Sequence, residues 1–313
     1  MPRGSLAWGP DMSVTVGFIG FGEVGCTLSA AMRACGVEVA AYDIVEKKVT
    51  LSGVPYRPLG DLAGRADYLL SAVTTQAAVG VAESCVRYLE SGQVYVDLNS
   101  TSPAVKAELD KIIRPSGAHF VEGAILGAVG VTGADTRILV GGPQARAVAE
   151  ALTGAGLRAS FYSEEIGKAS MFKMLRSIFS KGLEALILEL LIAGKRAGIG
   201  NDLWLELVEL MTKNPFERVA ENWVQSHPVA YDRRYHEMVQ VTATIREIGL
   251  SPLMTTATET FFDRSRALGL DEAFPAKPAC MEDVVAFMED RLCGPERRVT
   301  AGRPTRPRGD KDG

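Results

Sequence analysis

Short apolar runs alternate with amphipathic stretches through the first half of the chain, and each run has the length of a buried β-strand. Ser102 and Pro103 follow the fourth run and suit the N-cap and first turn of a helix. A loop is expected around Pro55, Pro58 and Gly60. Because strands that alternate with helices form parallel sheets, this half predicts an α/β fold with a doubly wound parallel sheet. The strand-like runs cover residues 14–19, 37–42, 67–73, 93–98, 119–125, 136–140 and 157–162.

The second half of the chain has a different pattern, because helical periodicity replaces the strand-like runs from Glu164 to about Leu292. Residues 167–197 predict one helix that is longer than a lone surface helix usually is. Amphipathic stretches follow at 233–249 and 253–268, and Pro215 and Pro228 are expected to mark turns between shorter helices. We therefore expect an all-α second domain.

A glycine motif, Gly20-x-Gly22-x-x-Gly25, lies between the first strand-like run and a helix-like segment. Gly20 allows a tight turn, Gly22 lets the backbone approach a pyrophosphate, and Gly25 lets helix and strand pack closely. The free N–H groups and the positive dipole end of the helix attract phosphate. A purely structural glycine turn is the alternative, but the strand, the helix length and a terminal acid together predict a dinucleotide-binding Rossmann unit. The cofactor-binding residues expected in this loop are Gly20, Gly22, Glu23, Val24 and Gly25.

Asp43 ends the second strand-like run, where an acid accepts hydrogen bonds from the adenosine ribose. Its negative charge would repel a 2′-phosphate, which favours NAD over NADP. Lys47 and Lys48 are close enough to weaken this preference, unless they are solvated charges on the next helix.

Polar residues also follow the third and fourth strand-like runs. Parallel sheets bind ligands at the carboxyl ends of their strands, so these residues would face the cofactor and the substrate. Each of them alone could equally be an ordinary turn or cap residue. They are Val73, Thr74, Thr75, Asn99 and Thr101 for the cofactor, with Ser100 for the substrate.

Composition excludes several classes of function. The chain has 313 residues, enough for about two domains, and its net charge of −4 gives no general attraction to nucleic acid or to an anionic membrane. The apolar stretch at 183–193 is too short to span a membrane. Five scattered cysteines show no metal-type spacing and predict reduced, mostly buried thiols in a cytoplasmic protein, without a metal.

These observations predict four segments. Residues 1–12 are expected to be a disordered extension. Residues 295–313 are expected to be a disordered tail, because they cannot bury enough apolar surface to become ordered. Residues 13–163 form the expected dinucleotide-binding Rossmann domain. Residues 164–294 form the expected helical domain, which would bind the substrate and dimerise.

Polar residues share one face of the long predicted helix: Lys173, Ser177, Ser180 and Glu184 follow at i, i+4, i+7 and i+11, with Arg176 beside them. The other faces are almost entirely apolar, so the helix should be substantially buried. Burying a lysine is costly unless it has a partner or a task. The stripe is therefore either solvated or directed towards the nicotinamide of the cofactor.

Five sequence segments resemble the β-hydroxyacid dehydrogenases, the family of 3-hydroxyisobutyrate and 6-phosphogluconate dehydrogenases. They are GFIGFGEVG, the YD pair that ends the second run, DLNSTSP, EGAILGAVGVTGADTRILVGG and GKASMFK. The resemblance covers about residues 14 to 270. It is strongest to a subgroup in which a lysine followed by Arg-Ser leads to Lys-Gly-x-Glu-Ala-Leu, here Lys173, Arg176-Ser177 and residues 181–186.

The resemblance implies a catalytic role for Lys173, which aligns with the family's general acid/base. Such a lysine would take the hydroxyl proton as hydride leaves for the nicotinamide. Desolvation and the nearby cation Arg176 are expected to lower its pKa towards neutrality. The resemblance also implies a small-molecule substrate and a homodimer.

The chain departs from the family where the substrate is held. Leu126-Gly127-Ala128 stands in place of Ser-Gly-Gly, and Arg176 in place of an asparagine. The family's later Lys-Asp pair has no clear counterpart near residues 233–237. These changes favour a substrate with an anionic end, held by Arg176 and Ser177, and an apolar body.

Three functions remain open from the sequence. The first is an NAD-dependent dehydrogenase for a hydroxyacid-like alcohol, with Lys173 as general acid/base. The second is an imine or ketone reductase on the same scaffold, although relatives with that activity generally lack the lysine. The third is a non-catalytic dinucleotide-binding protein, in which the altered segment Leu126–Ala128 would mark loss of substrate binding.

Overall fold

The computed structural model describes residues 14–294, apart from the side chains of Lys47 and Lys48. The predictions for residues 1–12 and 295–313, and for these two lysines, therefore lie outside the described residues. Contacts divide the chain into two compact units after Ser180. The last strand ends at Ser163, where we expected the first domain to end, and the division lies further on, inside a helix.

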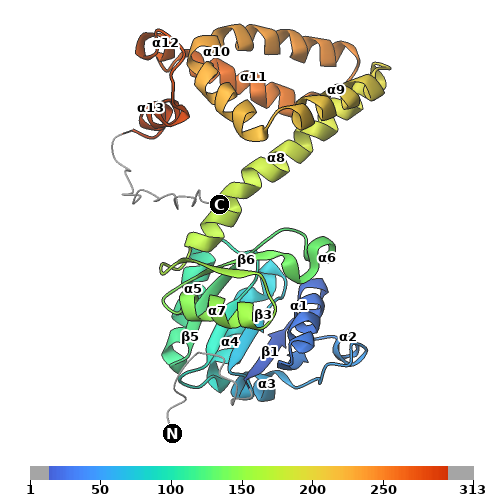
Figure 1. Ribbon diagram of the computed structural model, residues 1–313, viewed down its shortest axis with the longest axis vertical. Helices are drawn as coiled ribbons and strands as arrows, with labels where there is room; N and C mark the ends of the chain where they lie inside the picture. The colour runs from blue at the N-terminus through green and yellow to red at the C-terminus, as the bar shows by residue number, and fades with distance from the viewer. Residues whose placement is uncertain (1–13, 295–313) are drawn as a thin grey trace, which may run out of the picture. The chain divides into compact units, whose positions relative to one another are not determined.

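The first unit contains a seven-stranded sheet in the order β2-β1-β3-β4-β5-β6-β7 (Figure 1). All neighbouring strands are parallel except β5 and β6, which are antiparallel. The prediction of a largely parallel, doubly wound sheet is confirmed. The strands are β1 (Thr15–Ile19), β2 (Glu38–Tyr42), β3 (Tyr68–Ser71), β4 (Val94–Asp97), β5 (His119–Leu126), β6 (Arg137–Gly141) and β7 (Ala159–Ser163).

Alternate residues of the central strands pack into two separate cores. In β4, Val94 and Val96 belong to the core that includes Leu28 and Leu152, whereas Tyr95 belongs to the core that includes Leu62 and Leu109. Because both faces are covered, the central strands are largely apolar. The helices are α1 (Glu23–Ala34), α2 (Glu46–Thr50), α3 (Leu59–Arg65), α4 (Ala78–Cys85), α5 (Pro103–Ile113), α6 (Val129–Thr132) and α7 (Ala145–Gly154), with 3₁₀ turns at Thr75–Ala77, Val86–Tyr88, Arg114–Ser116 and Gly133–Asp135.

Pro55 and Pro58 lie in a loop as expected, but Gly60 lies in helix α3, which corrects the prediction at that residue. The helix begins directly after Pro58, and Gly60 lies within it. A Cβ added at Gly60 would lie 2.8 Å from the ring of Tyr88. The glycine therefore makes room for an aromatic side chain in tertiary packing and does not break the helix, which the sequence pattern alone does not reveal.

Helix α8 (Lys168–Arg196) forms as one element, as predicted for residues 167–197. The second unit then contains only helices among its described residues, which confirms an all-α region. No helix between residues 14 and 294 is long and apolar enough to cross a membrane. The remaining helices are α9 (Gly200–Lys213), α10 (Phe216–Glu247), α11 (Leu253–Arg266), α12 (Leu270–Ala273) and α13 (Met281–Cys293).

Pro228 lies inside α10 rather than in a turn, which corrects our prediction. Pro228 and the preceding His227 are both buried. His227 contacts the ring of Phe261 and lies 3.1 Å from the hydroxyl of Ser265, both on α11. Packing against α11 therefore holds the helix together where the proline removes a backbone hydrogen bond.

The apolar faces of α8 are exposed in the single chain, so the expectation of a substantially buried helix is wrong for this state. Leu175 is 58% exposed and Ile178 is 73% exposed. An apolar helix face predicts packing against other apolar groups, but the sequence does not say whether those groups belong to the same chain or to another molecule.

The cysteines also differ from the prediction of mostly buried thiols. Only Cys85 is buried among the described residues, whereas Cys26, Cys35 and Cys293 are exposed and Cys280 is intermediate. Cys26 and Cys35 lie in and after α1 on positions that face solvent. Scattered spacing in the sequence does not determine which face of a helix a residue occupies.

Candidate active site

Two of the three motif glycines have a steric reason to lack a side chain, and the third borders open space. Gly20 has a φ of 87°, and a Cβ there would collide with the carbonyl group of Ala72. A Cβ at Gly25 would collide with the carbonyl of Gly20, so the helix can approach the strand only without it. Around Gly22 there is no atom within 4 Å of an added Cβ, which leaves the backbone open to a ligand.

Helix α1 starts with no side-chain cap, because its N-cap residue is Gly22. Its first residues, Glu23 and Val24, therefore present backbone N–H groups beside the open space at Gly22. This arrangement fits the pyrophosphate of a dinucleotide, which needs N–H donors and a positive helix end. The carboxylate of Glu23 lies against Gly130 in α6, where a Cβ would meet it.

Asp43 follows β2 and is almost fully buried. Its carboxylate accepts hydrogen bonds from the backbone N–H of Phe21 (2.7 Å) and of Val45 (2.8 Å). The acid therefore fixes the glycine turn to the end of β2. Each carboxylate oxygen can accept more than one hydrogen bond, so this role leaves capacity for a ribose hydroxyl.

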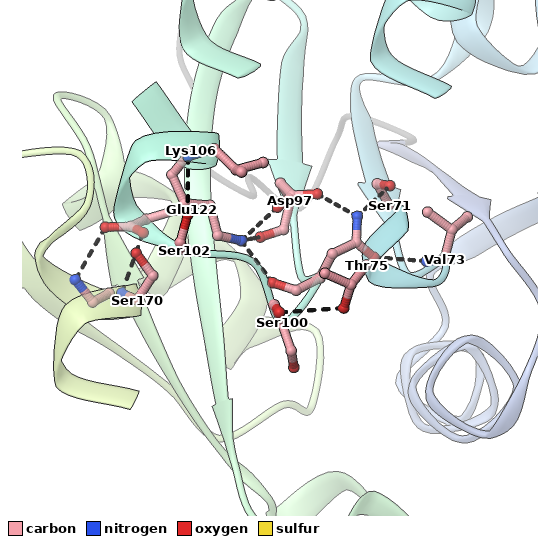
Figure 2. A network of polar contacts seen from close by, with 12 residues as sticks. Ser71, Val73, Thr75, Asp97, Ser100, Ser102, Lys106, Glu122 and Ser170 are labelled. Atoms are coloured by element: carbon pink, nitrogen blue, oxygen red, sulfur yellow. Dashed lines mark hydrogen bonds and ion pairs between the residues drawn. The ribbon is translucent and has the colours of Figure 1, made fainter. Parts of the chain in front are cut away.

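The turn after β4 is held by a network of polar contacts (Figure 2). The side chain of Asn99 accepts from the N–H of Val73 (2.7 Å) and donates to the hydroxyl of Ser71 (3.0 Å) and to the carboxylate of Asp97. Thr75 donates to the carbonyl of Ser100 (3.3 Å). The ends of β3 and β4 are thereby joined at the carboxyl edge of the sheet.

The network divides the predicted edge residues into two groups. Asn99 is buried and its side chain bonds to protein atoms, whereas Thr74 and Thr75 are exposed at the edge. Val73 is half-buried beside them. The hydroxyl of Thr101 is buried and has no hydrogen-bond partner among the described residues.

Lys173 lies one turn into α8 from the sheet, and its Nζ donates a hydrogen bond to the Oγ of Ser100 at 2.5 Å. The predicted acid/base residue and the predicted substrate-binding serine are thus in direct contact. Lys173 is half-buried, while Ser100 is exposed. An amine so placed can exchange a proton with a hydroxyl group bound at this edge.

The pKa of Lys173 is lowered to about 8, first by burial and then by the positive charge of Lys106. The direction agrees with our expectation, but the neighbouring cation is Lys106 and not Arg176. Arg176 is exposed. Solvent screens its charge, whereas Lys106 acts through the protein interior.

Two other predicted substrate residues, Arg176 and Ser177, follow Lys173 on α8 within the first unit. Arg176 makes no hydrogen bond or ion pair within residues 14–294 and is free to bind an anion. Ser177 donates to the carbonyl of Lys173 (2.9 Å), so its hydroxyl is bonded within its own helix.

The segment Leu126–Ala128 leaves the end of β5 at the same edge of the sheet. Leu126 is half-buried and packs on a small core that includes Ala169 of α8, one helical turn before Lys173. Gly127 has a φ of 151°, and Gly127 and Ala128 are exposed. An apolar side chain therefore lies close to the turn of α8 that carries the lysine.

The sequence analysis missed a buried ion pair beneath this site. Lys106 is 1% exposed and pairs with the carboxylate of Asp97. The signal was present, because Lys106 shares the buried face of α5 with Leu109 and Ile113 at i, i+3 and i+7. A lysine in line with core residues predicts a buried partner or a task.

Glu122 is a second residue that the sequence analysis missed. It is fully buried on β5 and accepts hydrogen bonds from the backbone N–H of Gly167 (2.7 Å), Ala169 (3.0 Å) and Ser170 (3.2 Å). Glu122 therefore caps the N-terminus of α8 and fixes the turn that precedes Lys173. A single acid inside an apolar strand was the available signal.

Described residues 14–294 contain no group of three or more His, Cys, Asp or Glu side chains arranged to hold a metal.

Two family models match the chain. Residues 15–155 match the NAD-binding domain of 6-phosphogluconate dehydrogenase, and residues 195–265 match a domain of unknown function, DUF1932. The first match covers the sheet, the glycine loop and the turn after β4.

Several proteins are similar over most of the chain. An uncharacterised 28.5 kDa protein of Methanothermus fervidus is 30% identical over 79% of this chain and 97% of its own length. The 2-(hydroxymethyl)glutarate dehydrogenase of Eubacterium barkeri is 22% identical over 83% of this chain and 92% of its own length.

Solved structures of similar fold were also found. A conserved protein of unknown function, described as structurally similar to 3-hydroxyacid dehydrogenases, is 34% identical over 83% of this chain and 98% of that chain, with a TM-score of 0.55. An imine reductase variant from Myxococcus stipitatus in complex with NAD+ is 19% identical over 88% of this chain and 100% of that chain, with a TM-score of 0.71, and shows the fold alone. The chain therefore belongs to the β-hydroxyacid dehydrogenase-like family as a divergent member, and it is an NAD(P)-dependent oxidoreductase.

Proposed function

We propose that the protein transfers a hydride between a nicotinamide cofactor and a hydroxyacid-like alcohol, with Lys173 as general acid/base. The observation that carries this proposal is the hydrogen bond from the Nζ of Lys173 to the Oγ of Ser100, at the carboxyl edge of the sheet. If the hydroxyl of a substrate lay as close to the Nζ of Lys173 as the Ser100 hydroxyl does, the amine could exchange a proton with it.

In the oxidative direction, the neutral amine of Lys173 takes the proton of the substrate hydroxyl as the C–O bond becomes a carbonyl. The nicotinamide, when bound, supplies the acceptor for the hydride that leaves the same carbon. In the reductive direction, the ammonium of Lys173 returns the proton to the carbonyl oxygen. A pKa lowered to about 8 suits both roles, because each protonation state is accessible near neutral pH.

The substrate that we propose has an anionic end and an apolar body. The exposed guanidinium of Arg176 lies one helical turn from Lys173 and can bind a carboxylate or phosphate in a bidentate manner. Leu126 offers an apolar wall where the family has a serine hydroxyl. The 2-(hydroxymethyl)glutarate dehydrogenase among the relatives, by its name, acts on a compound with an acid group and a hydroxymethyl group.

We propose NAD as the preferred cofactor, with NADP possible. The negative charge of Asp43 lies directly beside the glycine turn, where a 2′-phosphate of NADP would meet it.

The described cysteines are all unpaired, which fits a reducing compartment such as the cytoplasm.

A homodimer is the second part of this proposal. Exposed apolar side chains along α8, such as Leu175, Ile178 and Ile192, would be covered by a second copy. Sedimentation of the full chain tests it directly. A single species of twice the chain mass is expected, and a stable monomer at micromolar concentration would contradict it.

Reduction of an imine or ketone is the alternative activity. It is supported by the likeness of fold to an imine reductase. Relatives with imine reductase activity generally lack this lysine, so the presence of Lys173 favours the alcohol reaction. A non-catalytic cofactor-binding protein is the third possibility.

A substrate screen separates these activities. The absorbance of NADH and NADPH would be followed with three sets of compounds. These are hydroxyacids whose apolar bodies increase in size, the neutral esters of these acids, and a set of cyclic imines. The proposal expects oxidation of the longer hydroxyacids with NAD and weak turnover of the esters. Turnover of imines alone would favour the second activity, and cofactor binding without any turnover would favour the third.

A further inference from the structure

Lys106 is a fully buried lysine that the proposed proton transfer does not itself use. Its Nζ donates to the carbonyl of Asp97 (3.1 Å), to the carboxylate of Asp97 and to the carbonyl of Asn99 (2.8 Å). All three donor positions of the ammonium are therefore occupied. The acceptors belong to the end of β4 and to the turn that follows it.

This ion pair is costly to bury. Replacing a buried ion pair by apolar residues of similar volume is often neutral or stabilising, because desolvation offsets the attraction. Burial raises the pKa of Asp97, and the charge of Lys106 with the hydrogen bonds from Lys106 and Asn99 opposes this rise. Stability alone is thus a weak reason for a lysine at this position.

The contacts of Lys106 lead directly to Ser100. Asn99 is bonded through its side chain to Val73, Ser71 and Asp97, and through its carbonyl to Lys106. The amide group of the Asn99 side chain therefore bonds to residues at the ends of β3 and β4, which fixes its position relative to the sheet. Ser100 is the next residue, so the direction of its hydroxyl is set by a turn that Lys106 fixes from below.

The other partner of this hydroxyl approaches from α8. A Cβ added at Gly167, which precedes α8, would lie 3.2 Å from the Cβ of Pro103. The starts of α5 and α8 are therefore in close contact, with Lys106 one turn into α5 and Lys173 one turn into α8. Figure 2 shows Lys106 bonded to Asp97 at the end of β4, and Glu122 bonded to Ser170 at the start of α8.

We infer that Lys106 is a positioning residue for Lys173: its buried ammonium holds the Asn99–Ser100 turn and so places the hydroxyl that Lys173 contacts. This inference rests on the proposed role of Lys173 as general acid/base. Lys106 touches neither substrate nor cofactor in this account and acts only through Ser100 and through its charge.

The positive charge of Lys106 also acts on Lys173, in addition to the contacts that fix the turn. Together with burial it lowers the pKa of Lys173. Other ionisable groups on the elements that pack here are Asp97 on β4, which partly neutralises Lys106, Glu122 on β5, which caps α8, and the solvent-exposed Arg176 on α8. Removing the charge of Lys106 leaves Asp97 without its counter-ion, so both changes raise the pKa of Lys173.

The test uses Lys106→Met in the full-length protein, with Lys111→Met as the control because Lys111 is an exposed lysine of the same helix. The pKa of Lys173 is measured by NMR titration of isotopically methylated lysines, with the Lys173 signal assigned by its loss in Lys173→Arg. We expect Lys106→Met to raise this pKa towards that of an ordinary lysine and to lower kcat by about tenfold or more. Cofactor affinity should stay within about twofold, and Lys111→Met should match the wild type in every respect.

A second variant covers the case in which Lys106→Met does not fold. Asp97→Asn combined with Lys106→Met removes both members of the buried ion pair, so a smaller rise in the Lys173 pKa and a similar loss of kcat are expected. A folded variant of either kind with an unchanged Lys173 pKa and unchanged kcat overturns the inference. The titration needs no turnover, so it tests Lys106 even if Lys173→Met remains active and the proposed function fails.

Discussion

The Nζ of Lys173 lies 2.5 Å from the Oγ of Ser100, although the two residues are 73 positions apart. Lys173 comes from α8 and Ser100 from the turn after β4. Each side of this contact is fixed from the interior, by Glu122 at the start of α8 and by Lys106 beneath the turn. The contact is therefore a property of the fold of the first unit and not of a mobile loop.

The rate of alcohol oxidation should depend on pH through Lys173. The neutral amine is the active form in this direction, and its pKa is about 8. We expect kcat for oxidation to rise with pH up to about 8 and then to level off. For reduction the ammonium is the active form, so kcat should fall above the same pH. Steady-state rates in both directions between pH 6 and about 10 check this, and parallel profiles would contradict it.

Asp43→Asn should weaken the preference for NAD. The variant loses the negative charge and one acceptor of the hydrogen bonds from Phe21 and Val45, so the glycine turn also becomes less rigid. We expect a Kd for NAD raised about tenfold and a smaller change for NADP. Titration of cofactor fluorescence measures both constants. Glu38→Gln, an exposed acid at the other end of β2, serves as control.

The wild type gives the decisive comparison for this prediction. If the unaltered protein already binds NADP more tightly than NAD, the charge of Asp43 does not determine the cofactor.

Glu122→Ala should lower the free energy of unfolding by about 2–4 kcal/mol, because three N–H groups at the start of α8 lose a buried charged acceptor. Glu122→Gln keeps one acceptor oxygen and should lose less. Chemical denaturation followed by circular dichroism measures both changes. Glu165→Gln, which alters an exposed acid just before α8, should stay within about 0.5 kcal/mol of the wild type.

Arg176→Gln should raise KM for an anionic substrate by about tenfold or more, because a charged hydrogen-bond pair is lost. KM for the neutral ester of the same compound should hardly change. Lys168→Gln removes another exposed cation of α8 and should leave both values as they are. Equal effects of Arg176→Gln on acid and ester would remove Arg176 from substrate recognition.

The sequence predicts those parts of the fold that depend on local patterns. The glycine turn, the strands, the helix start at Ser102 and Pro103 and the single long helix α8 all follow from spacing and residue type. Ser102 caps α5 through a hydrogen bond from Val105, as its residue type suggests. Because Asp43 and Ser100 follow strands in a parallel sheet, their common edge is also predictable.

Features that depend on packing between distant segments are not predictable in this way. Gly60 lies in a helix with the ring of Tyr88 packed beside it, and Pro228 lies in a helix whose neighbouring residue His227 packs on α11. The cation that acts on Lys173 is Lys106, which is near only after α5 and α8 have packed. A lysine on the buried face of α5 gave a hint, but its partner was set by the fold.

The most direct test of the central claim is turnover by Lys173→Met under saturating cofactor and substrate, with Lys168→Met as the matched control on the same helix. Lys168 is exposed and pairs with Glu165, so its loss should not affect the site. We expect Lys173→Met to keep the cofactor affinity of the wild type and to lose roughly two or more decades of kcat, the scale of acid–base assistance. A Lys173→Met variant that turns over the same substrate at the rate of Lys168→Met would contradict the proposed role of Lys173.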